Sequence, residues 1–392
     1  MNTKPQRAIT VSYLAFIVLG LYDGILGVVW PSMRDSFGLP LDAVGILLVF
    51  GVLGFVLVSF GNGWLAGRFS TINIFLMSAI VRTVGFSIIA LSTIWPVVIL
   101  GGFLISAGAG GIDAGLNTYV ARHYRARQMN WLHANFGVGA TLGPLLVGGT
   151  LALNLSWRWS FAAVVILQII IIGLLLITYS SWENDVEEQK DDTGGVKKVG
   201  FGATLRLPLV WMGVGLFFLT TGTELSAGQW AFPLFTEARE VAEGTASVWV
   251  SVYWGSFTLG RFLLGFIVDR LSPKLFMRLS LGGVVLGALL LWTRPLPYAD
   301  FVGLAFAGFA LASIFPILIA TTPERVGREH AANAIGFQVA AAGLGGALLT
   351  GLAGVLADSV GLEVLGPYLV GTSALMVLLY EGVIFLSKRR RA

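Results

Sequence analysis

Apolar runs of about 20 residues follow one another along nearly the whole chain, separated by short polar segments. A helix of about 20 mainly apolar residues crosses the hydrocarbon core of a bilayer. The pattern therefore predicts an all-α membrane protein with twelve transmembrane helices. We place them at residues 8–31, 42–66, 72–93, 96–120, 130–153, 157–180, 206–235, 246–269, 274–292, 297–320, 331–356 and 365–387. No small-residue cleavage site follows the first run, so we expect it to be retained as the first helix.

One segment interrupts this pattern. Residues 181–200, SWENDVEEQKDDTGGVKKVG, are rich in charge and contain a Gly-Gly pair. Such a segment does not enter lipid, and its composition is typical of a flexible cytosolic linker. We therefore expect an N-terminal six-helix bundle at 1–181, a cytosolic linker at 182–204 and a C-terminal six-helix bundle at 205–392.

The two predicted bundles show signs of an internal repeat. GWLAGRFS begins at Gly63 and GFIVDRLS begins at Gly265, an offset of 202 residues. Other pairs keep nearly the same offset: Gly143 with Gly345 and Pro31 with Pro233 at 202, and Asp23 with Glu224 at 201. A near-constant offset across several helix pairs indicates duplication, as in many membrane transporters.

Composition and charge narrow the class of protein. The chain is 56% hydrophobic and 12% charged, and it contains 51 glycines and no cysteine. A soluble domain carries about twice that share of charge, so a soluble enzyme or a nucleic-acid-binding protein is excluded. The absence of cysteine excludes disulfides and thiolate metal sites.

Basic residues predict the orientation. With the N-terminus inside, nineteen of the 25 Lys and Arg residues fall in cytosolic segments and four fall outside. Cytoplasmic loops carry such an excess. We expect both termini in the cytoplasm, in an inner (plasma) membrane protein, with the terminal KRRR anchoring the topology or contacting lipid.

Twelve helices, a charged central linker and a repeated Gly-x-x-x-Asp-Arg loop resemble the major facilitator superfamily. The resemblance implies that fold, with two six-helix pseudo-repeat bundles. It also implies a conformational gate in the loops, which would include Gly63, Arg68, Gly265, Asp269, Arg270 and Lys274. The N-terminal copy has Gly67 at the position of the family's aspartate, which predicts a weaker latch there. The segments DGILGVVWPSMRDSF, GAGGIDAGLNTYV and TGTELSAGQW resemble the fucose/glucose/galactose proton-symporter branch.

Ionisable residues inside the predicted helices are the candidate coupling groups: Asp23, Asp113, Glu224, His133 and Arg82. Such residues cost free energy in lipid and usually serve transport. At about 1.5 Å of rise per residue, Asp23 and Glu224 lie in the outer half of the membrane and Asp113 and His133 in the inner half. Structural alternatives stay open: an Asp113–Arg82 pair that never titrates, hydrogen-bonding roles for Asp23 and Glu224, and an interfacial His133. Arg261 is interpreted as structural.

A second group of side chains suits a neutral polar ligand. Amides and acids bond sugar hydroxyls, and aromatic rings cover the apolar C–H faces of sugars. The candidate substrate-binding residues are Tyr22, Trp30, Asn117, Asn135, Gln229, Trp230, Tyr253, Trp254, Phe315 and Gln338. Trp30 and Trp230 also fit an interfacial aromatic belt.

Together these features predict a secondary active transporter of a small neutral polar solute, a sugar, coupled to protons by alternating access. A proton- or sodium-coupled exporter of amphipathic drugs or lipids is the alternative. We expect no enzymatic activity, no cofactor and no nucleic acid partner; the coupling ion is H+, with Na+ left open. The partners are the small-molecule substrate and the lipid bilayer, and we expect a monomer.

Overall fold

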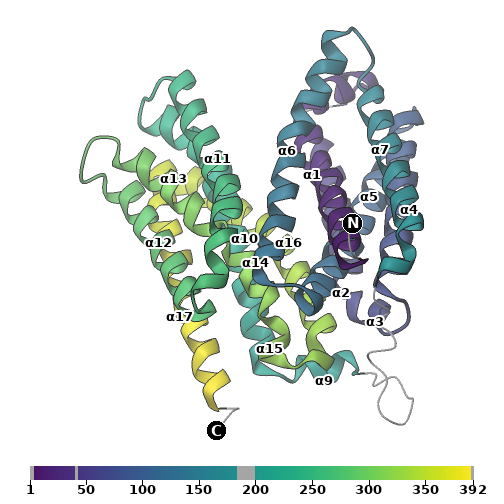
Figure 1. Ribbon diagram of the computed structural model, residues 1–392. Coiled ribbons are helices and arrows are strands. Elements are labelled where there is room, and N and C mark those ends of the chain that lie inside the picture. The colour runs from purple at the N-terminus through teal and green to yellow at the C-terminus, as the bar shows by residue number, and fades with distance from the viewer. Residues whose placement is uncertain (1–3, 40–42, 183–198, 390–392) are drawn as a thin grey trace. The chain divides into compact units, whose positions relative to one another are not determined.

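The computed structural model describes residues 4–39, 43–182 and 199–389, and within these ranges every regular element is a helix (Figure 1). Most of the predicted linker, residues 183–198, lies outside the described residues. The all-α fold expected from the apolar pattern is confirmed.

The elements of the N-terminal half follow the predicted runs closely. They are α1 (Lys4–Phe37), α2 (Val44–Phe60), α3 (Asn62–Ala66), α4 (Thr71–Leu91), α5 (Trp95–His123), α6 (Ala126–Ala152), α7 (Arg158–Ile177) and η2 (Tyr179–Ser181).

The C-terminal half repeats this series with more interruptions. Its elements are α9 (Phe201–Leu205), α10 (Pro208–Pro233), η3 (Leu234–Ala238), α11 (Glu243–Ile267), η4 (Val268–Arg270), α12 (Pro273–Thr293), α13 (Ala299–Leu311), α14 (Ile314–Ala320), α15 (Thr322–Val326), α16 (Arg328–Val360), η5 (Leu362–Val364) and α17 (Leu365–Arg389).

Ten candidate membrane spans among the described residues are long and apolar enough to cross a membrane, by length and composition. The two predicted spans that are not among these ten are the second and the fifth. The second corresponds to α2, which has only 17 residues, and the fifth corresponds to α6, which contains Pro144. Two predicted spans are split. Residues 42–66 divide at Gly61 into α2 and α3, and residues 297–320 divide at Ala312 and Ser313 into α13 and α14.

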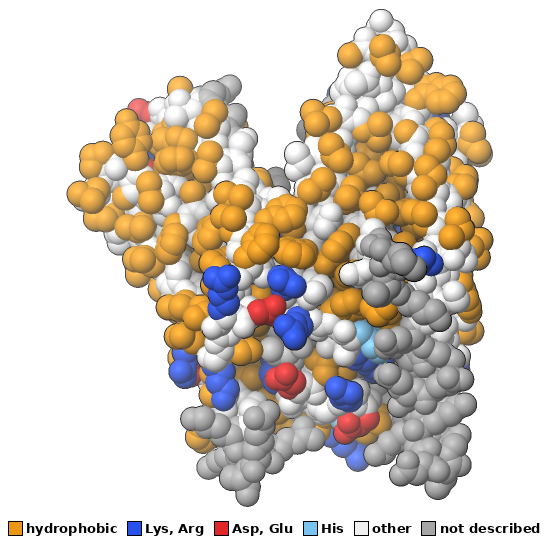
Figure 2. All heavy atoms as spheres, viewed as in Figure 1, with side chains coloured by type: hydrophobic (Ala, Val, Ile, Leu, Met, Phe, Trp, Pro, Cys, Tyr) orange, Lys and Arg blue, Asp and Glu red, His pale blue; other side chains and the backbone are white. Residues whose placement is uncertain are grey.

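Side-chain chemistry on the surface agrees with a bilayer environment. Apolar side chains cover most of the face seen in Figure 2, and Lys, Arg, Asp and Glu gather toward its lower end. Leu91 and Ile177 are each 80% exposed. Exposing such apolar side chains to water is unfavourable, whereas contact with lipid tails is favourable.

The chain divides into two compact units. The first comprises Met1–His123, Leu132–Phe201 and Ala331–Ala340, and the second comprises Tyr124–Trp131, Gly202–His330 and Ala341–Ala392. The domain boundaries expected at the linker stay a prediction.

Close helix packing inside each unit depends on repeat-related glycines. In the first unit, a Cβ at Gly143 of α6 would lie 2.5 Å from the carbonyl oxygen of Leu21 on α1. In the second unit, a Cβ at Gly345 of α16 would overlap the carbonyl oxygen of Phe218 on α10. Small residues at helix crossings let backbones approach closely, which is how helices associate in lipid. The same crossing is thus built twice, 202 residues apart.

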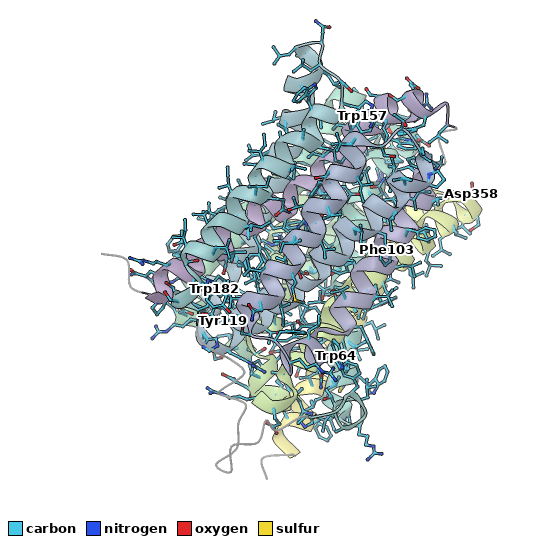
Figure 3. The ribbon with its side chains drawn as sticks, turned by 90° about the vertical axis from the view of Figure 1, so that its right-hand side faces the viewer. Trp64, Phe103, Tyr119, Trp157, Trp182 and Asp358 are labelled. Atoms are coloured by element: carbon cyan, nitrogen blue, oxygen red, sulfur yellow. The ribbon has the colours of Figure 1, made fainter. Side chains whose placement is uncertain are left out.

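Aromatic packing fixes the chain where it leaves α7. The ring of Trp182 lies 5.0 Å from that of Tyr119 and 5.9 Å from that of Phe75, centroid to centroid. Figure 3 shows Trp182 beside Tyr119 at one end of the first unit, with Trp157 toward the other end. The start of the linker segment is therefore anchored to α4 and α5.

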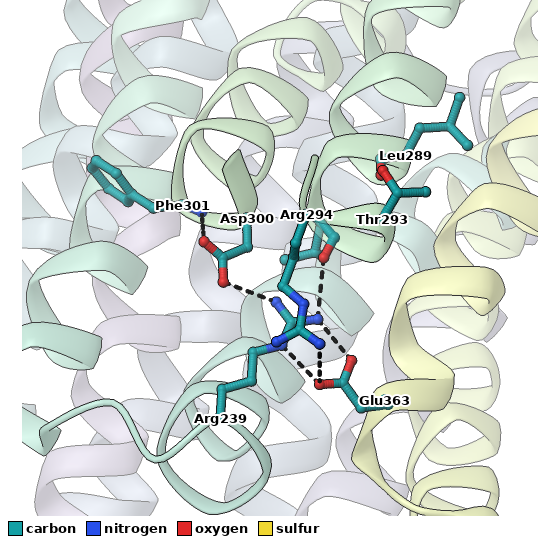
Figure 4. Close-up of polar contacts among 8 residues, drawn as sticks. Arg239, Leu289, Thr293, Arg294, Asp300, Phe301 and Glu363 are labelled. Atoms are coloured by element: carbon teal, nitrogen blue, oxygen red, sulfur yellow. Dashed lines mark hydrogen bonds and ion pairs between the residues drawn. The ribbon is translucent and has the colours of Figure 1, made fainter. Parts of the chain in front are cut away.

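An ion cluster around the buried side chain of Arg239 joins several elements of the second unit (Figure 4). Arg239, which follows η3, donates to both carboxylate oxygens of Glu363 at 2.9 and 2.8 Å and to Asp300 at 3.2 Å. It also donates to the carbonyl oxygen of Leu291 at 3.1 Å. The Arg239 side chain is only 3% exposed. One guanidinium thus links η3, α12, α13 and η5.

We expect Arg239→Gln to lower the free energy of unfolding by about 2 kcal/mol, because breaking a buried pair strands its carboxylates and Glu363 is partly solvated. Thermal unfolding of the purified protein in detergent measures the effect. Arg278→Gln is the matched control: its pair with Glu381 is exposed on both sides, and such pairs contribute at most about 1 kcal/mol. Equal decreases of the melting temperature in the two variants would contradict the stabilising role assigned to the buried Arg239.

Candidate functional site

The first unit carries an acid, a tyrosine and a cation close together. Tyr22 and Asp23 are neighbours on α1, and Arg82 comes from α4. The Arg82 guanidinium lies 5.4 Å from the ring centre of Phe86, and the Tyr22 ring meets the edge of the same ring at 5.8 Å and 78°. The opposite charges of Asp23 and Arg82 attract each other. Asp23 is exposed, whereas Arg82 is 1% exposed.

A hydrogen-bonded chain links α5 and α6 in the same unit. The Asn117 Nδ2 donates to Asp113 Oδ1 at 2.8 Å, and His133 Nε2 lies 3.1 Å from Asn117 Oδ1. Because an amide oxygen only accepts, this contact is a hydrogen bond in the His133 tautomer that carries the proton on Nε2. The helical spacing of four residues places Asn117 on the same face as Asp113, as the sequence predicted. His133 is 6% exposed and packs edge-on against Phe16 at 5.5 Å.

The second unit contains a comparable cluster. Glu224 lies on α10, and Tyr253 and Arg261 lie on α11. Tyr253 Oη donates to the backbone carbonyl of Glu224 at 2.8 Å, and Arg261 acts electrostatically on the Glu224 carboxylate. Arg261 Nε also donates to the carbonyl oxygen of Ala312 at 3.3 Å, and its guanidinium lies 4.2 Å from the Phe257 ring. Both units therefore set a carboxylate beside a tyrosine and an arginine.

The candidate ligand residues differ widely in accessibility. Gln229 and Trp254 are exposed, Asn135 and Phe315 are partly buried, and Gln338 is 1% exposed. Tyr253 is fully buried and meets Trp254 at 5.0 Å. Only some of the candidate ligand-binding side chains are therefore exposed in this conformation.

The two tryptophans near the outer ends have partners within their own units. Trp30 is 6% exposed and packs against Trp95 at 5.7 Å. The indole N–H of Trp230 donates to the carbonyl oxygen of Thr350 at 2.9 Å. These contacts hold both rings in place.

The N-terminal loop motif packs against the start of α16. A Cβ at Gly63 would overlap Asn333 Oδ1, and Asn333 Nδ2 donates to the carbonyl oxygen of Val199 at 3.0 Å. Arg68 stacks on the Trp64 ring at 3.9 Å, so an aromatic face holds this guanidinium in a loop that lacks the family's aspartate.

The C-terminal loop motif packs against the start of α6. A Cβ at Gly265 would lie 2.8 Å from Trp131 Nε1 and 3.5 Å from Asn130 Cβ. Asp269, Arg270 and Lys274 are exposed. Each loop glycine therefore meets the beginning of a helix inside its own unit.

Three asparagines in these contacts were missed by the sequence analysis. Asn62 is fully buried and donates to Thr118 Oγ1 at 3.1 Å and to the carbonyl oxygen of Ala332 at 3.3 Å. Asn130 Oδ1 accepts from Ser313 Oγ at 2.5 Å. The repeat could have revealed two of them, because Asn130 and Asn333 are 203 residues apart.

Comparisons with known proteins agree with this architecture. The sequence matches the profile of the Major Facilitator Superfamily over residues 12–239 and 229–392. It is 22% identical to the glucose/mannose transporter GlcP of Bacillus subtilis over 347 residues, covering 87% of this chain and 86% of that protein. It is 24% identical over 385 residues to Bypass of stop codon protein 6 of Saccharomyces cerevisiae, covering 89% and 77%.

Solved structures share the fold. The crystal structure of FucP in the outward conformation matches with a TM-score of 0.76 at 16% identity, covering 98% of each chain. The proton:xylose symporter XylE matches with a TM-score of 0.77 at 13% identity, covering 96% of this chain and 95% of the other.

We expect Gly63→Ala to destabilise the protein by about 1–3 kcal/mol, because the added methyl group has no space beside Asn333. Gly67→Ala is the matched control: its Cβ would be 3.5 Å or more from its neighbours, so a neutral or slightly higher melting temperature is expected. Thermal unfolding of both purified variants decides; a Gly63→Ala protein as stable as the wild type would contradict the close packing.

Proposed function

Since the chain belongs to the Major Facilitator Superfamily of membrane transporters, we propose that it moves a small neutral sugar across the plasma membrane, coupled to H+ by alternating access. Two curated relatives and two solved structures support the substrate class by their names. They are a glucose/mannose transporter, a mouse sodium-dependent glucose transporter, a fucose:proton symporter and a proton:xylose symporter. The observation that carries the proposal is the hydrogen-bonded chain of Asp113, Asn117 and His133 on α5 and α6.

Asp113 is the proposed proton carrier. A carboxylate inside a span is costly in its charged form, so binding and releasing a proton there changes the energy of the conformations that hold it. Asn117 donates to the carboxylate and ties it to His133. Protonation of Asp113 would weaken the bond from Asn117 and so alter contacts between α5 and α6.

Asp23 and Glu224 are proposed as further ionisable groups of the cycle. They occupy related positions in the repeat, and each has an arginine acting on it, Arg82 and Arg261 respectively. Protonation of either carboxylate would leave the positive charge of its arginine uncompensated and so change the local electrostatic field. Both acids therefore suit groups whose charge changes during transport.

The sugar would be held by amides and aromatic rings. Asn135, Gln229 and Gln338 are the amides proposed to bond hydroxyl groups. The exposed ring of Trp254 is suited to cover an apolar sugar face. The loop motifs around Gly63 and Gly265, with Arg68, Asp269, Arg270 and Lys274, are proposed to form the cytoplasmic gate.

We expect Asp113→Asn to abolish sugar accumulation driven by a pH gradient while exchange of labelled for unlabelled sugar continues, because the amide cannot carry a proton. Uptake into proteoliposomes at equal protein density measures both activities, with a loss of at least about tenfold expected for accumulation. Asp358→Asn, which changes an exposed carboxylate on α16, should leave both unchanged.

Three results would contradict this proposal. Undiminished pH-driven accumulation by the Asp113→Asn protein would remove the proton role from that residue. Accumulation driven by a Na+ gradient instead of a pH gradient would identify Na+ as the coupling ion. Binding of hydrophobic cations but of no sugar would favour the exporter of amphipathic compounds.

A further inference from the structure

Three neighbouring polar side chains in the first unit have no hydrogen bond to any residue in the described part of the chain. The Nε and Nη1 atoms of Arg82 are enclosed and have no acceptor. Neither the Tyr22 hydroxyl nor the Asp23 carboxylate bonds to any described residue. We call Tyr22, Asp23 and Arg82 the Arg82 cluster.

For the enclosed guanidinium of Arg82, this lack of partners carries an energetic penalty. A buried donor without an acceptor costs about 1–3 kcal/mol, and more when it is charged. The Asp23 charge and the Phe86 ring offset part of the cost for Arg82. They do not supply the acceptors that its enclosed N–H groups need. By contrast, Asn117 in the same unit is bonded on both sides.

Neighbouring residues nevertheless hold the cluster in a defined place. Phe86 contacts both the Tyr22 ring and the Arg82 guanidinium. The α5 helix leaves room for the arginine stem at Gly108, where an added Cβ would overlap Arg82 Cγ and lie 3.2 Å from Arg82 N. The glycine-rich run of α5 therefore gives Arg82 space to reach this position.

The chemistry of the cluster selects its ligand. Arg82 offers only donors, the Asp23 carboxylate only acceptors, and the Tyr22 hydroxyl either. An alcohol both donates and accepts, so two neighbouring hydroxyls can accept from Arg82 and donate to Asp23 at once. A ligand carboxylate would accept from Arg82 but would be repelled by Asp23. A cationic ligand would be attracted by Asp23 but repelled by Arg82.

We propose that the Arg82 cluster binds a vicinal diol of the transported sugar, and that it selects neutral sugars over sugar acids. The proposal rests on the function proposed above and adds Arg82 to the residues that touch the substrate. Asp23 is exposed and Arg82 is 1% exposed. The proposed ligand would therefore enter beside Asp23, the exposed member of the cluster.

The test is equilibrium binding to the full chain in lipid nanodiscs, with D-glucose, its monodeoxy analogues and D-glucuronate as probes. We expect Arg82→Gln to weaken D-glucose binding at least tenfold, equivalent to about 1.4 kcal/mol. The deoxy analogue that lacks the hydroxyl bound by Arg82 should bind the wild type as weakly as D-glucose binds the variant. The variant should bind this analogue and D-glucose equally well, because the contact between Arg82 and that hydroxyl is already absent.

Tyr22→Phe provides a milder variant that keeps the ring contact with Phe86, and it should weaken D-glucose binding several-fold. This second variant tests the cluster even if Arg82→Gln fails to fold. Tyr179→Phe is the matched control, because the Tyr179 hydroxyl bonds Asn73 at an exposed position. D-glucose affinity should be unchanged in that control.

Unchanged D-glucose affinity in a folded Arg82→Gln protein, or in Tyr22→Phe where Arg82→Gln does not fold, would overturn the diol site and leave the proposed function standing. Tighter binding of D-glucuronate than of D-glucose, lost in Arg82→Gln, would overturn it in favour of an anion site. If the wild type binds neither D-glucose nor any analogue, both the diol site and sugar transport fail. The two failures are therefore distinguishable.

Discussion

A bilayer core contains no water to bond polar groups, and this constraint shapes each unit of the protein. The backbone meets it by forming helices. Polar side chains within the predicted spans meet it by pairing, as Asn117 does with Asp113 and with His133. Arg82 is a charged exception, because two of its nitrogens are enclosed without an acceptor among the described residues. In the proposed diol site, the transported solute itself would complete the bonding of this guanidinium.

Glycine provides the second common element of the two units. Lipid tails are as apolar as leucine, so helices in a membrane associate through close packing and hydrogen bonds. Gly143 and Gly345 place α6 and α16 against the backbones of α1 and α10 at repeat-related positions. Gly108 has a different effect, since the absence of a Cβ there leaves space for the Arg82 side chain. One residue type thus serves both the packing of the bundles and the shape of the candidate site.

Much of this could be predicted from the sequence. The resemblance to the major facilitator superfamily is confirmed by a match that extends over both halves, and with it the expectation of a transporter and not an enzyme. Every predicted span corresponds to a helix, although two are split. The bond between Asn117 and Asp113 followed from a spacing of four residues on one helix. The roles of these residues in coupling stay predictions.

The sequence by itself determined the helices, their repeat and which ionisable residues lie within them, because length, hydropathy and helical periodicity are local properties of the chain. Only the tertiary structure decided which residues become neighbours. It set Arg82 beside Asp23 and Tyr22, and Asn333 beside Gly63. It also left three side chains of one cluster without bonding partners among the described residues. Such pairings depend on the rotation and crossing of each helix, which are fixed by side-chain packing between segments far apart in the chain.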